Sequence, residues 1–235
     1  MKMTRKLIPA FVMLLVSAIM LSTASFAWFA SNRDVKAESM TVKANVVTQF
    51  LQISNAQGGD YSTVASPANV NAKTLDLVHA KIENGNSVKW YTGTSKDHLT
   101  GAKDGELSPI DTTQPNALDN YVLLNTFWFK MYETSNDNLS DLVVKSVTIT
   151  SGEGDKFAQA LRVLVVGEGG VAEIWSNTDG EFKRVGEETV LLSTVTKTAQ
   201  SVDVYVYYDG EDASANTSNA IDLGNITVSV SFVTD

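Results

Sequence analysis

Few residues of this 235-residue chain have the types and spacing needed for acid–base or metal chemistry. The two histidines, His79 and His98, are too far apart in sequence to form the pair that one turn of a helix presents to a metal ion. His79 lies in the apolar run LVHAKI, which favours a strand residue with a satisfied partner over a catalytic base. Cysteine is absent, which excludes disulfides, thiolate ligands and a cysteine nucleophile.

Adjacent carboxylates occur at Glu187-Glu188 and at Glu211-Asp212. Neighbouring acids in polar loops are typical of a solvated face, and a weak divalent-cation site is the alternative. The turn at 209–212 lacks the ligand spacing of an EF-hand loop, and the chain has no HExxH helix, GxSxG elbow, GxGxxG loop or P-loop. We therefore expect no enzymatic activity, no catalytic residue, no metal site and no cofactor. A surface hydrolase with an unfamiliar site is the lesser alternative.

A group of aromatic residues could stack against a carbohydrate ring. The alternative, which we favour, is that these side chains fill a core and form cross-strand pairs on the sheet surface. The group comprises Trp128, Tyr132, Tyr205, Tyr207 and Tyr208.

Alternating β-strands must position all of these side chains. The hydrophobic pattern after the first 30 residues has a period of two, with turn residues between the runs, and it predicts about ten strands and no long helix. The fold class expected is all-β, an antiparallel sandwich of jelly-roll-like or immunoglobulin-like type, with long loops at 54–74 and 93–120. A small subdomain within 54–120 is left open, as is the choice between strand and short helix for Leu75–Ile82. The main predicted strands are Val35–Val47, Ser87–Thr92, Tyr121–Thr134, Leu142–Thr150, Ala160–Val166, Val171–Ser176, Glu181–Val185, Val202–Tyr208 and Asn225–Val233.

The start of the chain has the three parts of an export signal. Lys2, Arg5 and Lys6 are followed by an uncharged, largely apolar run from Leu7 to Ala30. An uncut membrane anchor is the alternative, because about 20 helical residues span a bilayer. The basic residues would stay in the cytoplasm in either case, so the remainder of the chain is expected outside.

Small residues end the apolar run and indicate a cleavage site. Signal peptidase requires small side chains at the −3 and −1 positions, and Ser25 and Ala27 meet this requirement, leaving Trp28 as the new N-terminus. We therefore expect 1–27 to be a signal peptide. An exported chain without cysteine fits a Gram-positive bacterial surface or extracellular location.

The charge balance limits the partners. Aspartate and glutamate number 27 against 18 lysine and arginine residues, for a net charge of −9. Such a chain repels phosphate backbones, so nucleic-acid binding is not expected. Contact with a membrane is expected only through the leader.

The segment SFAWFASNRDVKAESMTVKANV, residues 25–46, joins small residues, the aromatic pair Trp28-Phe29 and an alternating strand. It resembles the TasA and camelysin group of Firmicutes, which are exported biofilm-fibre and cell-surface proteins. The resemblance implies a jelly-roll sandwich at 48–235 whose N-terminal segment, 28–47, is donated to the sheet of the next subunit. It further implies that Val35, Ala37, Met40 and Val42 are the inserting side chains. Camelysin-type members have been labelled metallopeptidases, but no zinc-ligand motif is present to carry that activity over.

Two hypotheses for function follow. The first is an exported structural subunit that polymerises head to tail by donor-strand complementation into a surface filament or biofilm-matrix fibre, with itself and a related minor subunit as partners. The second is an extracellular binding or adhesion module tethered by an uncut N-terminal helix.

Overall fold

The computed structural model describes Met13 and residues 35–36, 41–46, 50–67, 74–92, 107–133, 138–150, 159–215 and 227–234. The chain divides into two compact units, Met1–Asp34 and Val35–Asp235. In the first unit only Met13 is described, as an exposed helical residue. No helix among the described residues has the length and apolar character needed to cross a membrane. The architecture below is that of the second unit.

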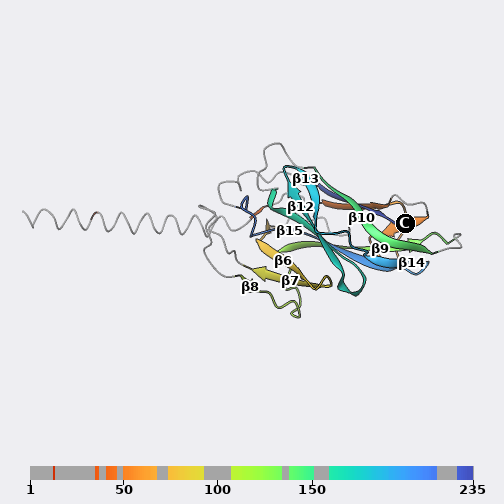
Figure 1. The fold of residues 1–235 in the computed structure, drawn as a ribbon, viewed down its shortest axis with the longest axis horizontal. Coiled ribbons are helices and arrows are strands. Elements are labelled where there is room, and N and C mark those ends of the chain that lie inside the picture. The colour runs from red at the N-terminus through yellow and green to blue at the C-terminus, as the bar shows by residue number, and fades with distance from the viewer. Residues whose placement is uncertain are drawn as a thin grey trace, which may run out of the picture. The chain divides into compact units, whose positions relative to one another are not determined.

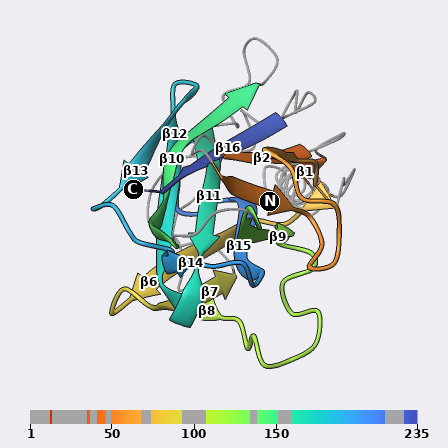
Figure 2. The same cartoon turned by 90° about the vertical axis from the view of Figure 1, so that its right-hand side faces the viewer.

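The second unit is all-β where it is described, which confirms the all-β part of the predicted fold class. Apart from short 3-10 turns such as η2 (Glu168–Gly170), its regular elements are strands. Figures 1 and 2 show these strands gathered into curled sheets.

A five-stranded sheet has the order β14-β10-β16-β2-β4. Strand β2 pairs in parallel with β16, with Val42 beside Val228, and the other strand pairs of this sheet are antiparallel. Strand β4 covers only Ala44 and Asn45 of β2. The strands are β14 (Leu192–Val195), β10 (Leu139–Thr150), β16 (Thr227–Val233), β2 (Thr41–Val46) and β4 (Val64–Ala65).

A six-stranded sheet has the order β13-β12-β11-β15-β9-β3, and all of its pairs are antiparallel. Strand β11 is buried along nearly its whole length, as its continuous apolar run predicts. Asp179 and Gly180 both have positive φ, the conformation that a tight hairpin between β12 and β13 requires. The strands are β13 (Glu181–Val185), β12 (Ala172–Thr178), β11 (Leu161–Val166), β15 (Gln200–Tyr208), β9 (Val122–Met131) and β3 (Leu51–Ser54).

The principal hydrophobic core draws on both of these sheets. Phe129 of β9 packs edge-on against Phe232 of β16, with ring centroids 4.8 Å apart. Strand β2 contributes its alternate residues Val42, Ala44 and Val46, which are buried in this core. This is the alternation that the sequence predicts for the strand.

A third, three-stranded sheet packs on the opposite face of the six-stranded sheet. It contains β6 (Val78–Glu83), β7 (Ser87–Thr92) and β8 (Ser108–Pro109). Trp90 of β7 lies against Tyr205 and Tyr207 of β15, with centroids 5.6 and 5.2 Å apart, in a second hydrophobic cluster. This sheet occupies the interval in which the sequence leaves a small subdomain open, and it shares its core with the larger sheet.

Several short strands lie where the sequence shows no strand signal. The interval 54–74 holds β4 and the start of β5 (Thr74–Leu75), which pairs with β1 (Val35–Lys36). Strand β8 lies within 93–120 and β14 follows β13, while Leu75–Ile82 is resolved as strand rather than helix. Strands of two to four residues are too short for a period to emerge, so their neighbours rather than their sequence define them.

Candidate functional site

The N-terminal segment, predicted to be donated to another subunit, is partly described. Val35 pairs with Leu75 of the same chain, and Val42 is fully buried in the core of the same chain. Other predicted residues lie outside the described ranges, namely the cleavage residues Ser25, Ala27 and Trp28, the aromatic Phe29, and Ala37 and Met40.

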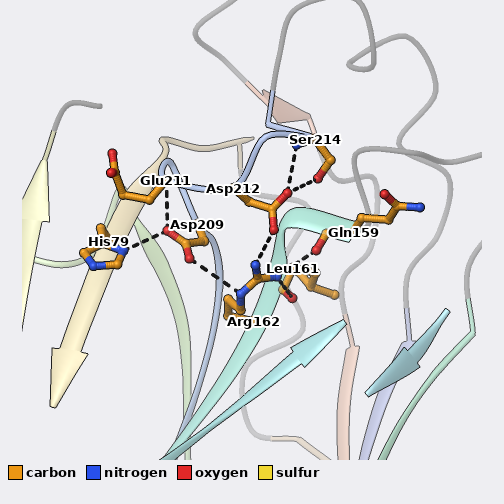
Figure 3. Close-up of polar contacts among 8 residues, drawn as sticks. All are labelled: His79, Gln159, Leu161, Arg162, Asp209, Glu211, Asp212 and Ser214. Atoms are coloured by element: carbon orange, nitrogen blue, oxygen red, sulfur yellow. Dashed lines mark hydrogen bonds and ion pairs between the residues drawn. The ribbon is translucent and has the colours of Figure 1, made fainter. Parts of the chain in front are cut away.

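The most connected polar cluster surrounds Arg162, a charged residue on the otherwise apolar strand β11 (Figure 3). Its guanidinium lies between two carboxylates, with Nε 3.5 Å from Asp209 and Nη2 hydrogen-bonded to Asp212. Nη1 donates to the carbonyl oxygens of Gln159 (2.7 Å) and Leu161 (3.0 Å). A buried guanidinium needs this degree of pairing, because desolvating an unpaired charge is costly.

Asp209 joins this cluster to the three-stranded sheet. Its Oδ1 lies 2.9 Å from Nδ1 of His79 on β6 and accepts the backbone N–H of Glu211 at 3.0 Å. The N–H of Gly210 donates to the carbonyl of Val78 on the same strand. His79 is therefore a strand residue with a satisfied partner, as the sequence predicts.

Asp212 is a half-buried anchor rather than part of a solvated face. Its Oδ1 accepts the Ser214 hydroxyl at 2.6 Å and the Ser214 N–H at 2.8 Å. Burial alone would raise the pKa of this carboxyl, but the hydrogen bonds from Ser214 and the positive charge of Arg162 together bring the pKa below its ordinary value. The interpretation of the Glu211-Asp212 pair as a solvated face is thus wrong for Asp212, because the lone arginine on β11 requires a counter-charge.

The arrangement supports anchoring rather than chemistry. The nitrogens of Arg162 are engaged, both aspartates accept several hydrogen bonds, and the cluster ties the segment 209–215 to β11 and β6. In the described part of the chain, no group of three or more histidines, cysteines or acidic residues is placed to hold a metal ion. The second histidine, His98, lies outside the described ranges.

A second cluster surrounds Glu173, which is 2% exposed. Its carboxylate accepts the indole N–H of Trp175 at 2.9 Å. Burial raises its pKa, and the hydrogen bond from Trp175 and the charge of Arg184 oppose that rise. Nε of Arg184 lies 3.1 Å from the carboxylate but is poorly aligned for a hydrogen bond, so charge attraction holds the pair.

Arg184 also links the two large sheets, from the edge strand β13 of one to the inner strand β10 of the other. Its Nη2 donates to the carbonyl of Val144 on β10 at 2.6 Å, although Arg184 itself belongs to β13. The same nitrogen is 3.2 Å from Glu188, while Glu187 is exposed. Of the adjacent acids Glu187 and Glu188, only Glu188 therefore has an ion-pair partner in the described structure.

The aromatic group considered as a carbohydrate platform is divided between environments. Tyr207 and Tyr208 are fully buried, and Tyr205 packs on Trp90. Tyr132, by contrast, is 48% exposed at the end of β9. The core interpretation favoured from the sequence is correct for the three tyrosines of β15, and these residues form no shared surface with Tyr132.

The structural importance of Arg162, Glu173 and Arg184 was not predicted. One signal was available for the first two, because a single charge inside an apolar strand must find a partner when the strand is buried. The identity of that partner depends on strand pairing, which the local pattern does not contain.

No family model matches this chain, and no curated protein or solved structure is significantly similar to it.

Proposed function

We propose that this protein is an exported structural subunit with a jelly-roll sandwich fold, and that copies polymerise head to tail by exchanging the N-terminal strand. The closed form, in which β2 completes the sheet of its own chain, would be the monomer. In the filament, β2 of one copy would take the same place in the next. A head-to-tail exchange does not close on itself, so it produces a fibre.

The strand order supports the jelly-roll proposal. From β9 onward the chain alternates between the two large sheets, with β10, β14 and β16 in one and β9, β11 to β13 and β15 in the other. The neighbours β2-β16-β10-β14 and β9-β15-β11-β12 are those that two interleaved Greek keys produce. The parallel pairing of β2 with β16 departs from an all-antiparallel jelly roll.

The parallel pair β2–β16 is the observation that carries the proposed exchange. Strands β2 and β16 come from opposite ends of the domain sequence, and no hairpin connects them. Their pairing therefore does not require that the two strands belong to the same copy. The buried row Val42, Ala44 and Val46 provides the apolar contacts. A second copy could therefore supply an identical strand with identical contacts, which is the condition for a swap of low free-energy cost.

The link between β2 and β3 supports exchange as well. Only 47–50 separate the two strands, and Phe50 has a φ of 71°. A bulky residue in the left-handed region costs on the order of 1 to 3 kcal/mol. Opening of this link in an exchanged copy would relieve that strain, and short strained hinges favour swapping.

Single-cysteine chains test the proposal, because the native chain has no cysteine. Val42→Cys and Val228→Cys place thiols on directly paired residues. Neither chain alone can close an internal disulfide, so a mixed-chain disulfide forms only if β2 of one copy pairs with β16 of another. We expect this crosslink in assembled, mildly oxidised mixtures of the two full-length chains.

The matched control pairs Val42→Cys with Leu192→Cys on β14, which is not a neighbour of β2. Filaments that form with no more Val42–Val228 crosslink than this control would rule out strand exchange.

A further inference from the structure

Large hydrophobic side chains that remain exposed gather at the two opposite edges of the six-stranded sheet. In the second unit, the described residues of this kind near the β3 edge are Phe50 (47%), Val64 (57%) and Tyr132 (48%), and those near the β13 edge are Val185 (56%) and Val190 (40%). Strands β3 and β13 end the order of this sheet, and Figure 2 shows β13 and β9, the neighbour of β3, on opposite sides of it. Each group is small, so its role as a contact surface depends on the charges beside it as well as on its apolar side chains.

The aromatic patch comprises Phe50, Lys130 and Tyr132. The N–H of Tyr132 donates to the carbonyl of Phe50 at 2.8 Å, so these two residues are adjacent across the end of the β3–β9 pair. Lys130 lies two residues before Tyr132, on the same side of β9, and its Nζ is 4.4 Å from the ring centroid of Tyr61. Across the described ranges no carboxylate is within ion-pair distance of this ammonium group.

The acidic patch comprises Val185, Glu187 and Val190, at the end of β13 and in the segment that follows it. Both valines are exposed, and Glu187 between them is exposed too. No ion pair involves Glu187 among the described residues, because Arg184 is bonded to Glu173 and Glu188 instead. This edge therefore presents an aliphatic surface with an uncompensated negative charge.

We propose that the aromatic patch of one copy binds the acidic patch of the next, as a second contact between copies in addition to the exchanged strand, with Lys130 and Tyr132 outside the link 47–50 that the exchange opens. Each patch offers what the other lacks, since one has exposed rings beside a cation with no carboxylate partner and the other has exposed valines beside an anion with no cationic partner among the described residues. This inference rests on the proposed polymerisation. The two patches lie on opposite edges of one sheet, so the contact is heterologous and repeats along a fibre.

The size of the patches determines their role. Each patch has three residues, far fewer than the roughly 20 to 30 residues that each partner contributes to a stable interface. The contact is therefore weak between free monomers. Once strand exchange holds two copies together, the second contact becomes intramolecular, and its effective concentration makes a weak affinity sufficient. Its charged pair fixes the orientation of neighbouring copies more than it adds affinity.

Crosslinking between single-cysteine chains tests the geometry. Full-length Tyr132→Cys and Val185→Cys chains are mixed, assembled and oxidised, and the mixed disulfide dimer is compared with each chain alone. We expect at least about a fivefold excess of the mixed dimer, because a heterologous contact brings unlike patches together. A yield no higher than that of the matched mixture of Tyr132→Cys with Lys89→Cys, which is exposed on β7, would overturn the proposal.

Charge reversal tests the chemistry. Lys130→Glu and Glu187→Lys should each lower the yield of the Tyr132–Val185 crosslink about three- to fivefold, the range of one surface ion pair. The double variant Lys130→Glu/Glu187→Lys, carried in the same chain, should restore it. A crosslink yield from the double variant that is no higher than the yield from each single variant would refute the pairing of Lys130 with Glu187.

The two contacts can fail independently. None of these substitutions lies in 28–47, so the Val42–Val228 crosslink should form in every charge variant. If that crosslink is absent while the Tyr132–Val185 crosslink forms, strand exchange is wrong, and the patch contact stands with some other contact holding the copies together. The opposite result leaves strand exchange in place and removes the patch contact.

Discussion

At the level of single residues, two buried charged clusters hold the molecule together, and they respond to pH in opposite directions. Asp212 has a lowered pKa because it is hydrogen-bonded to Ser214 and paired with Arg162. Glu173 has a raised pKa because burial outweighs its hydrogen bond from Trp175 and the charge of Arg184. The ionised form is favoured by the fold in the first case and disfavoured in the second, so the two acids contribute stability in different pH ranges.

We expect Asp212→Asn to destabilise the fold by about 1 to 3 kcal/mol at neutral pH, since it weakens a charge-assisted bond to a buried arginine. The pKa of Asp212 is lower in the folded protein than in the unfolded chain. Its contribution is therefore complete above the ordinary value of 3.8 and is lost as pH falls through the folded value. Urea unfolding of the native chain and the variant between pH 7 and about pH 2 measures this, and the difference between the two stabilities should shrink as the pH falls below 3.8.

Lys183→Met provides the control, because Lys183 is exposed and its ion pair with Glu181 is largely solvated. A difference in stability between Asp212→Asn and the native chain that stays constant down to about pH 2 would contradict the assigned role of the carboxylate.

At the level of elements, the sequence predicts the long strands well and the short ones poorly. Strand β15 has its valines in one core and Tyr205 and Tyr207 in the other, as strict alternation requires. Strand β14 and the two-residue strands carry no comparable signal, because pairing with distant segments defines them. The candidate site was likewise predictable only in part. The sequence indicates that Arg162 needs a partner, but the identity of the partners, Asp209 and Asp212, follows only from the path of 209–215 beside β11.

The short link before β3 permits a prediction about exchange. We expect Phe50→Gly to stabilise the closed monomer by about 1 kcal/mol, because glycine adopts a φ of 71° without strain. The same change should slow filament growth, since it removes both the strain released on opening and the Phe50 ring of the aromatic patch, and growth slower than that of Phe50→Ala isolates the effect of the strain. Thermal unfolding and light scattering measure the two effects on one sample.

Phe50→Ala separates this effect from loss of the ring. Alanine removes the aromatic side chain but keeps a Cβ in the left-handed region, so it should not stabilise the monomer. Equal stabilisation by glycine and alanine would show that the backbone strain at Phe50 is not involved.

At the level of the whole molecule, the net charge of −9 opposes every contact between copies. Like-charged subunits repel over a Debye length, which falls from about 30 Å at 0.01 M salt to about 8 Å at 0.15 M. Strand exchange and the patch contact must both form against this repulsion. The exchanged strand does so through buried apolar residues that salt does not screen, whereas the Lys130–Glu187 attraction is itself screened.

Salt should therefore affect assembly in two separable ways. Raising sodium chloride from about 10 to about 150 mM should shorten the lag before filaments scatter light, because general repulsion between copies exceeds one attractive pair. Over the same range, the difference in lag between the Lys130→Glu chain and the native chain should shrink, because salt screens the Lys130–Glu187 attraction in the native chain and the like-charge repulsion that replaces it in the variant. Filaments that dissolve as salt rises would instead mean that ion pairs, rather than the buried row of β2, hold the copies together.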